Sequence, residues 1–409
     1  MADHPCNCFE TLFKGPYTPI TTLDALHTYL QAAVTLEFAT IPAYTTALYS
    51  MQDTSSGAYQ LTRSVAFEEM FHVYQAANLL VAVGGVPRFT EAYTPKYPTF
   101  IPNANQRTTP YIGLNRASVA VYETVFMGIE TPAPYEAPPQ DQQIQTIGQF
   151  YKAIELGLIY LETQAQQQGE SIFKNTPGYG QHLNYYLGKG GGQIIEVTNL
   201  DDAKLAILQI VQQGEGAVTP DHALVQTSPW GAYNHYGVRV DGNYGPIAGT
   251  PMELSHYFKF KRVVDGVDPL PSTYPVVGVA SLSNYSNPTA IATANLFNQY
   301  YSHLLVALEN AFKGGAEARK TYLQQAMPIM NIALPNLARV LMSTPIWADQ
   351  ASSSVGPNAL PTWSWVATTP QATVTATQRL ADQNENEAEA QLLQHCTTAL
   401  DGFCRMAQA

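Results

Sequence analysis

Two short motifs of the same form, Glu-x-x-His, lie far apart in this chain. One joins Glu69 to His72, and the other joins Glu253 to His256. Residues three apart project from one face of an α-helix, so each motif presents a carboxylate beside an imidazole. A carboxylate can bridge two metal ions while an imidazole binds one of them. A single motif of this kind is common by chance, but a second copy favours a shared metal site.

Two further acidic residues fall on apolar helical patterns. Glu37 lies seven residues after Leu30 and four before Ile41, and Glu215 continues the stripe that contains Val211. Both spacings place the carboxylate on the face of a helix that turns toward the core. Burying an ionised carboxylate without a partner costs several kcal/mol, and metal ions supply the compensating charge.

Taken in chain order, these residues follow the pattern Glu, Glu-x-x-His, Glu, Glu-x-x-His. Four-helix bundles that hold two carboxylate-bridged metal ions use this set of ligands. The predicted metal ligands are Glu37, Glu69, His72, Glu215, Glu253 and His256.

Each ligand also has a structural interpretation. Glu37 could be a core acid that is hydrogen-bonded by a tyrosine such as Tyr44, and a histidine such as His72 is by itself more often a satisfied core residue. Glu253 could complete a capping box after Thr250 and a proline, and Glu215 stands between two glycines that could end a helix.

Glu155 competes with these acids for a ligand position on the third helix. The apolar stripe of that segment leaves Glu155 beside it rather than on it, and the stripe consists of Ile147, Tyr151, Ile154, Leu158 and Leu161. We therefore leave Glu155 as the alternative to Glu215 or Glu253.

The elements that must position these side chains are mainly helices. Apolar periodicity and capping signals, among them a capping box at Thr21 and Asp24, predict helices over residues 23–51, 59–83, 115–129, 147–168, 201–215, 251–264, 289–313, 316–343 and 374–407. Pro42 should bend the first helix, and the run that starts at Gly84 should end the second. The short link makes these two helices antiparallel neighbours, and a long crossover follows.

The sequence thus predicts a mainly α fold with two parts. Residues 1–265 form a four-helix bundle with long loops rich in proline, glycine and tyrosine, and residues 288–409 form an additional C-terminal helical region packed on the bundle. The four cysteines lie near the two ends of the chain, and their spacing fits neither a zinc site nor a dense disulfide framework.

Composition excludes several classes of protein. The 409 residues carry a net charge of −12, which argues against nucleic acid as a partner. No apolar run of about 18 residues predicts a membrane span, and the first residues lack the layout of a signal peptide. We therefore expect a cytoplasmic protein that contacts no membrane. No dinucleotide, P-loop or nucleophile-elbow motif occurs.

Several segments carry a resemblance to a known family. They are residues 36–44 (LEFATIPAY), 68–72 (EEMFH), 84–87 (GGVP), 146–151 (TIGQFY), 213–216 (QGEG) and 255–260 (SHYFKF). These segments resemble the ferritin-like domain associated with iminophenyl-pyruvate dimer synthases of the violacein type. The similarity covers about residues 20–265 and is looser beyond. It implies a ferritin-like fold with a metal site at the six residues named above.

The resemblance does not extend to the dimerising oxidation, which larger family members assign to a separate haem-binding region. Our first hypothesis is an oxidoreductase in which two irons, or iron with manganese, activate dioxygen or peroxide to oxidise a small organic metabolite, aromatic or derived from an amino acid. The second is a non-catalytic metal-binding or scaffold protein of a secondary-metabolite pathway. The third is a bundle that keeps the ligand residues without using metal. The oligomeric state stays open, a homo-oligomer included.

Overall fold

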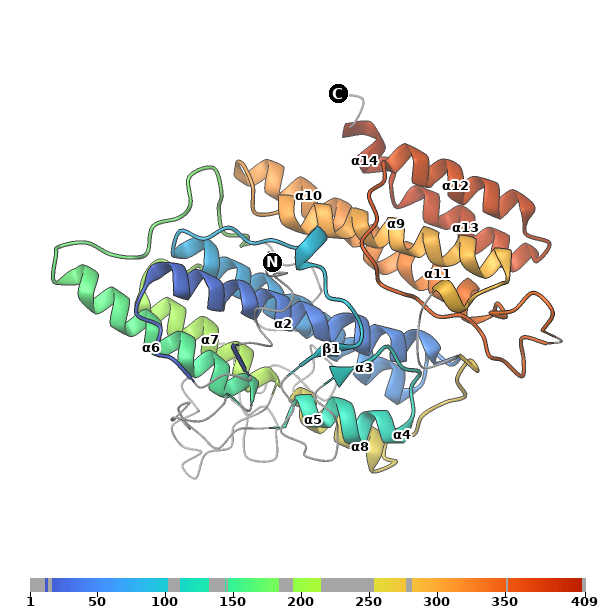
Figure 1. Ribbon diagram of the computed structural model, residues 1–409, viewed down its shortest axis with the longest axis horizontal. Helices are drawn as coiled ribbons and strands as arrows, with labels where there is room; N and C mark the ends of the chain where they lie inside the picture. Colours follow the sequence, from blue (N-terminus) through green and yellow to red (C-terminus); the bar gives the residue numbers. More distant parts are fainter. Residues whose placement is uncertain are drawn as a thin grey trace.

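The computed structural model is mainly helical (Figure 1). It describes residues 12–13, 17–101, 111–131, 144, 146–183, 194–214, 254–276, 282–350 and 352–406. Within these residues, no helix combines the length and apolar character that a bilayer crossing requires.

Two long helices form the centre of the molecule. Helix α2 (Leu23–Ser50) begins at Thr22, whose hydroxyl accepts a hydrogen bond from the backbone of Ala25, one residue later than the predicted cap at Thr21. Pro42 lies inside α2, which continues through it. Helix α3 (Gly57–Ala82) ends where Gly84 adopts a φ of 87°, a left-handed conformation that glycine permits. The predicted end of the second helix is confirmed.

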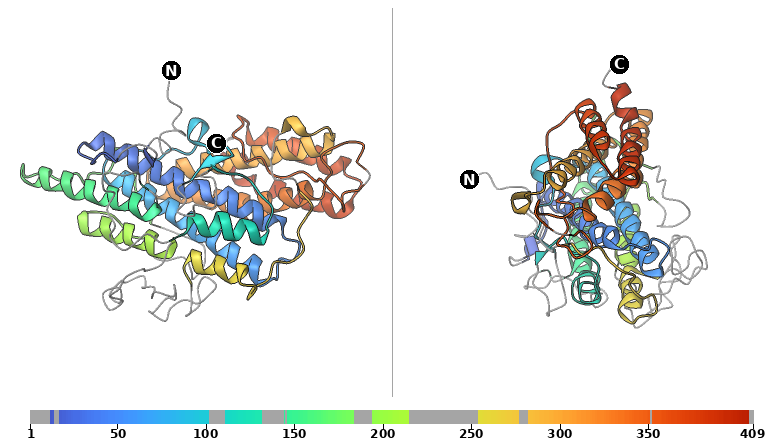
Figure 2. Two further views of the ribbon diagram at one scale, coloured as in Figure 1. Left: turned by 60° about the horizontal axis from the view of Figure 1, so that its bottom comes forward. Right: turned by 90° about the vertical axis from the view of Figure 1, so that its right-hand side faces the viewer.

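Two interrupted columns of helices complete the bundle (Figure 2). In the third column, the short helices α4 (Val119–Val121) and α5 (Met127–Ile129) flank a π-helical turn, Tyr122–Phe126, and α6 (Ile147–Gln166) continues along α2. In the fourth column, α7 (Leu200–Gly214) and then α8 (His256–Val264) lie along α3. Each column is broken near the middle of the bundle. Helix ends therefore meet there, beside the uninterrupted α2 and α3.

The start of α8 differs from the prediction. The sequence predicted a helix from residue 251, but Leu254 and Ser255 precede the first turn and Ser255 is the N-cap. The histidine of the second Glu-x-x-His motif is therefore the first residue of its helix, and the glutamate of that motif lies outside the described residues.

Helices α9 (Pro288–Asn310), α10 (Ala316–Pro328) and α11 (Leu334–Met342) lie against α2 and α3 on the side away from α5 and α8, with a π-helical turn, Ile329–Ala333, between the last two. The prediction of a single helix over 374–407 is wrong. The chain forms α12 (Pro370–Gln383), α13 (Glu387–Thr398) and α14 (Asp401–Met406). Asn386 caps α13 through its side chain, and such local side-chain bonds compete with helix continuation.

The remaining regular structure is small. The proline-rich segment after α3 contains a 3-10 turn (Glu91–Tyr93) and a two-stranded antiparallel sheet. The sheet consists of β1 (Thr99–Phe100) and β2 (Tyr111–Ile112). A second 3-10 turn, Leu282–Asn284, precedes α9. The division at residues 265 and 288 stays a prediction.

Candidate metal centre

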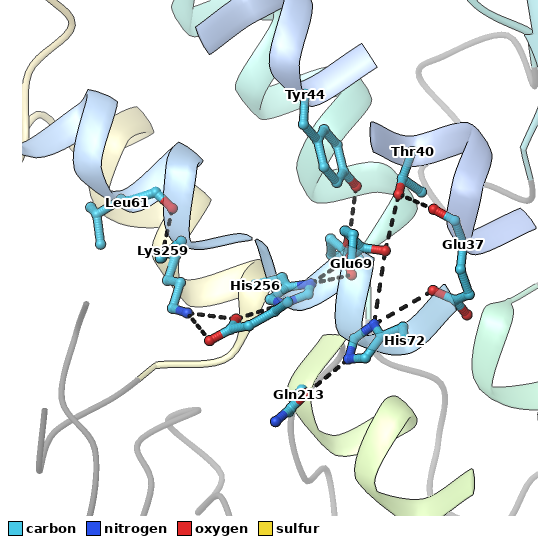
Figure 3. A network of polar contacts seen from close by, with 12 residues as sticks. Glu37, Thr40, Tyr44, Leu61, Glu69, His72, Gln213, His256 and Lys259 are labelled. Carbon is cyan, nitrogen blue, oxygen red and sulfur yellow. Dashed lines mark hydrogen bonds and ion pairs between the residues drawn. The ribbon is translucent and has the colours of Figure 1, made fainter. Parts of the chain in front are cut away.

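Acidic and imidazole side chains converge where the two columns are broken. Glu37 comes from α2, Glu69 and His72 come from α3, Glu130 caps the C-terminus of α5, and His256 opens α8. All five are buried, with at most 2% of each residue exposed. The sequence therefore brings charged groups from four elements into one closed space (Figure 3).

His256 lies at the centre of the cluster. Its Nδ1 is 2.8 Å from Oε1 of Glu69 and 3.6 Å from Oε2 of Glu130. This nitrogen makes no hydrogen bond of acceptable geometry to any described residue, although two carboxylates face it. Its other nitrogen, Nε2, lies 2.8 Å from Oε2 of Glu68.

His72 has a similar arrangement on the neighbouring turn. Its Nδ1 lies 3.5 Å from Oε2 of Glu37 and 3.8 Å from Oε2 of Glu69, while Nε2 lies 2.9 Å from Oε1 of Gln213 at the end of α7. The two imidazole centroids are 5.3 Å apart. Ligand atoms of Glu69, His72 and His256 lie within 4.8 Å of one another, close enough to share a metal ion.

Hydroxyl groups hold the carboxylates in place. Tyr151, on the first turns of α6, donates a hydrogen bond of 2.7 Å to Glu37, and Tyr44 donates one of 2.6 Å to Glu130. Thr40 lies 3.0 Å from Oε2 of Glu69. Glu37 and Glu130 each turn the oxygen that is not bonded by a tyrosine toward a histidine, whereas the Glu69 oxygen bonded by Thr40 is also the one that faces His72.

A further buried ion pair lies behind His256. Lys259 Nζ is 2.8 Å from Oε1 and 2.7 Å from Oε2 of Glu68, and neither residue is exposed. Glu68 thus contacts both a lysine and the outer nitrogen of His256. This geometry fixes the ring of His256 so that Nδ1 faces Glu69 and Glu130.

The electrostatics of the cluster are strongly perturbed. Burial lowers the pKa of His72, but the carboxylates of Glu37 and Glu69 beside its Nδ1 overcome this effect and raise the value to about 9. The carboxylates likewise hold the pKa of His256 well above its ordinary value despite burial. Burial raises the pKa of Glu37 to about 7. Burial acts in the same direction on Glu69, but the two histidines beside it hold its pKa below its usual range. The carboxylates therefore hold positive charge beside them.

The residues fit a divalent cation on two further grounds. Carboxylate oxygens and imidazole nitrogens are the donors that iron, manganese and zinc accept, and they face one another across the cluster. Gly214 leaves space as well, because a Cβ at that position would lie 3.1 Å from Oε2 of Glu130. Any larger residue at the end of α7 would press on this carboxylate.

Four of the six predicted ligands meet here, namely Glu37, Glu69, His72 and His256. Glu215 and Glu253 lie outside the described residues. The half-buried Glu155 instead forms an ion pair of 3.1 Å with Lys152. Tyr44, the tyrosine expected near Glu37, hydrogen-bonds Glu130 instead, and Tyr151 takes the place beside Glu37.

Two further acids of the cluster, Glu130 and Glu68, were not predicted from the sequence. Glu130 follows Tyr122 by eight residues and Phe126 by four, and both aromatic residues are buried, so the helical stripe could have identified it. Glu68 gives no such signal, because it lies on a different face of α3 from Glu69.

Comparisons with known proteins agree with this architecture. A family model described as "Ferritin-like" matches residues 30–265. No curated protein matches the chain. A solved structure described as a ferritin-like protein from Caulobacter vibrioides is similar with a TM-score of 0.54 and 19% sequence identity, over 85% of this chain and 100% of that chain. At that identity the likeness concerns the fold alone.

Proposed function

This chain belongs to the ferritin-like family, and on that premise we propose that its buried cluster holds two metal ions and serves an oxidoreductase. The proposed ligands are Glu37, Glu69, Glu130, His72 and His256. Glu130 is proposed in addition to the acids expected from the sequence. Glu215 and Glu253 stay candidates from the sequence.

The position of Glu69 carries the proposal. One of its carboxylate oxygens faces Nδ1 of His256 and the other faces Nδ1 of His72. A carboxylate placed between two imidazoles could serve as a ligand shared by two metal ions. Glu37 and Glu130 would be further ligands, since each lies beside one of the histidines.

The outer contacts of the histidines support the same assignment. Glu68 accepts a hydrogen bond from Nε2 of His256, and the amide oxygen of Gln213 accepts one from Nε2 of His72. Bonds of this kind fix the tautomer and leave the opposite nitrogen as a ligand. In both residues that nitrogen is Nδ1, which faces the carboxylates.

Bound iron, or iron with manganese, would supply the activation of dioxygen or peroxide. The chain itself surrounds the cluster with side chains that exclude water, and it holds protons at defined atoms. Tyr44 packs against Phe126 and Phe260, with ring centroids 4.7 and 5.1 Å away, so aromatic side chains exclude water from one side of the cluster. Tyr44 and Tyr151 hold their protons at the outer oxygens of two ligand carboxylates. A closed site of this kind suits a small organic substrate.

Elemental analysis of protein expressed with abundant iron tests the metal site. We expect about two metal ions per chain, and an apoprotein whose Tm rises when ferrous iron is added. Glu69→Gln should lose most of the metal, whereas the matched change Glu155→Gln should keep it, because Glu155 pairs with Lys152 outside the cluster. A Glu69→Gln protein that is folded and still contains about two metal ions per chain would refute the assignment of Glu69 as a metal ligand.

Oxygen consumption separates the two functional hypotheses. Apoprotein that takes up ferrous iron and then consumes dioxygen supports the oxidoreductase. Metal uptake with no consumption in the presence of candidate aromatic or amino-acid-derived substrates favours the non-catalytic metal-binding or scaffold protein.

A further inference from the structure

A hollow lies on the face of the central helix pair that is opposite the metal cluster. One wall is formed by α2 and α3, and the other includes the chain that runs from α10 to α11. Its wide outer part has a volume of about 350 Å³ and is bordered by Arg63 and Arg339. A narrow inner part of about 40 Å³ is almost wholly apolar, with Phe38 and Leu304 among its walls. Met70, Met327 and Met330 line both parts, so the two parts adjoin at these side chains.

We propose that this groove binds an organic anion that has a carboxylate head and a linear apolar tail. The head lies at the two arginines and the tail lies between Phe38 and the methionines. None of the groove residues is a proposed metal ligand, so the inference goes beyond the proposed function and does not depend on it.

The helices fix the direction and length of the groove. Arg63 and Tyr74 border opposite parts of it on α3 and are eleven residues apart, which corresponds to about 16 Å at the rise of an α-helix. Tyr49 and Phe38 are also eleven residues apart on the antiparallel α2. Both walls thus run from a polar end to an apolar end over the length of a medium-chain fatty acid.

Charge selects the kind of head group. The chain has 20 lysines and arginines against 32 acids, yet two guanidinium groups border this one hollow. Neither forms an ion pair with a carboxylate in the described ranges. Arg63 is exposed and lies over the ring of Phe67 at 4.2 Å, which orients its planar donors. A carboxylate matches these donors with two parallel hydrogen bonds.

The inner part suits an alkyl or aryl-alkyl tail. It offers no charged side chain, and a polar group placed there would lose its hydration. Its present volume is small, but Met70, Met327 and Met330 are only half-buried. Methionine side chains change rotamer at low cost, so these three can widen the entrance as a tail enters.

Calorimetric titration of the full chain with octanoate, decanoate, dodecanoate and dodecanol tests the proposal. Affinity should rise about fourfold for each added methylene until the groove is filled. Dodecanol should bind at least about tenfold more weakly than dodecanoate, because it lacks the charge that the arginines recognise. Equal affinity for the acid and the alcohol, or none for either, would overturn the inference.

Variants separate the two ends of the groove. The double variant Arg63→Gln and Arg339→Gln should weaken dodecanoate about tenfold or more and leave dodecanol unchanged. Arg379→Gln is the matched control, since Arg379 is exposed beside a surface hollow on α12. Met327→Trp should remove the dependence on chain length while octanoate still binds.

Sedimentation of the same proteins checks the competing occupant. A dimer that the double arginine variant abolishes would identify the groove as a contact between two copies of this chain and overturn the proposal. The metal content of these variants should match the wild type, so failure of this inference and failure of the proposed metal site give different results.

Discussion

The bundle and the C-terminal helices bury histidine in opposite ways. In the bundle, His72 lies among carboxylates, and they raise its pKa to about 9 although burial lowers it. In the C-terminal helices, His303 lies on α9 with its Nε2 3.0 Å from the hydroxyl of Thr373, and burial lowers its pKa to about 4. The same residue type is thus held positive in one region and neutral in the other.

The difference extends to the other buried polar groups. The C-terminal helices satisfy theirs with neutral pairs, such as Asn298 with Thr362 at 2.8 Å and Tyr300 with Thr377 at 3.1 Å. The bundle instead gathers several carboxylates around two histidines and one lysine. Neutral pairs are enough to specify a packed core. An excess of buried acid is costly unless cations balance it, which is why the bundle, and not the C-terminal region, is the place to expect a metal.

The largest predicted effect concerns the buried ion pair behind His256. Lys259→Met removes the ammonium group that pairs with the buried carboxylate of Glu68, and we expect a loss of about 3–5 kcal/mol in the free energy of unfolding of the apoprotein. Adding Glu68→Gln to that variant removes the negative charge that Lys259 balances and should recover most of the loss. Chemical denaturation of the three proteins measures both effects.

A surface pair provides the control for this experiment. Lys152→Met breaks the ion pair with Glu155, which solvent screens, so its cost should stay below about 1 kcal/mol. If the double change at positions 68 and 259 is as destabilising as Lys259→Met alone, charge balance does not explain the bundle.

A smaller effect is predicted from the pH dependence of His303. Its pKa is about 4 in the folded chain against 6.5 for the unperturbed group, so the unfolded chain binds more protons between these values. Stability should therefore fall as the pH drops from 6.5 toward 4, by up to about 3 kcal/mol from this residue. His303→Gln should flatten this part of the profile, measured as Tm against pH.

The matched substitution is His27→Gln, because His27 is only part-buried and its Nε2 hydrogen-bonds the backbone of Val83 at the end of α3. The fall in stability that His303 causes should persist in this variant, because His303 is retained. An unchanged slope in His303→Gln itself would mean that the acid sensitivity arises elsewhere.

The helices could be predicted because their signals are local. A cap at Ser56 and a left-handed glycine at position 84 set the limits of α3, and apolar periodicity places Glu69 and His72 toward the core. The break between α12 and α13 was missed because periodicity continues across it, whereas Asn384 and Asn386 bond locally and end the turn.

The site was predicted only in part, because its remaining members depend on which helix lies opposite. Glu68 and Glu69 are neighbours in sequence, and both are buried. No local sequence pattern indicates that α8 places Lys259 beside Glu68, or that it places His256 beside both Glu68 and Glu69. Glu130 continues the buried stripe of Tyr122 and Phe126, but that stripe does not show that His256 lies beside it.

The smallest predicted effect compares two buried tyrosines. Tyr151 donates to the Glu37 carboxylate, and Tyr300 bonds the neutral hydroxyl of Thr377. Hydrogen bonds to charged groups contribute about 1.5–3 kcal/mol, and those between neutral groups about 0.5–1.5. Burial raises the pKa of Glu37 to about 7, so the comparison is made at about pH 8, where this carboxylate is charged. Tyr151→Phe should then destabilise the apoprotein more than Tyr300→Phe by about 1 kcal/mol, as measured by urea denaturation. Both changes delete one hydroxyl from a fully buried ring, so the loss of packing is matched. Equal costs would mean that the hydroxyl of Tyr151 does not stabilise a charged carboxylate, and the contrast between the two regions would then rest on the histidines and on Lys259.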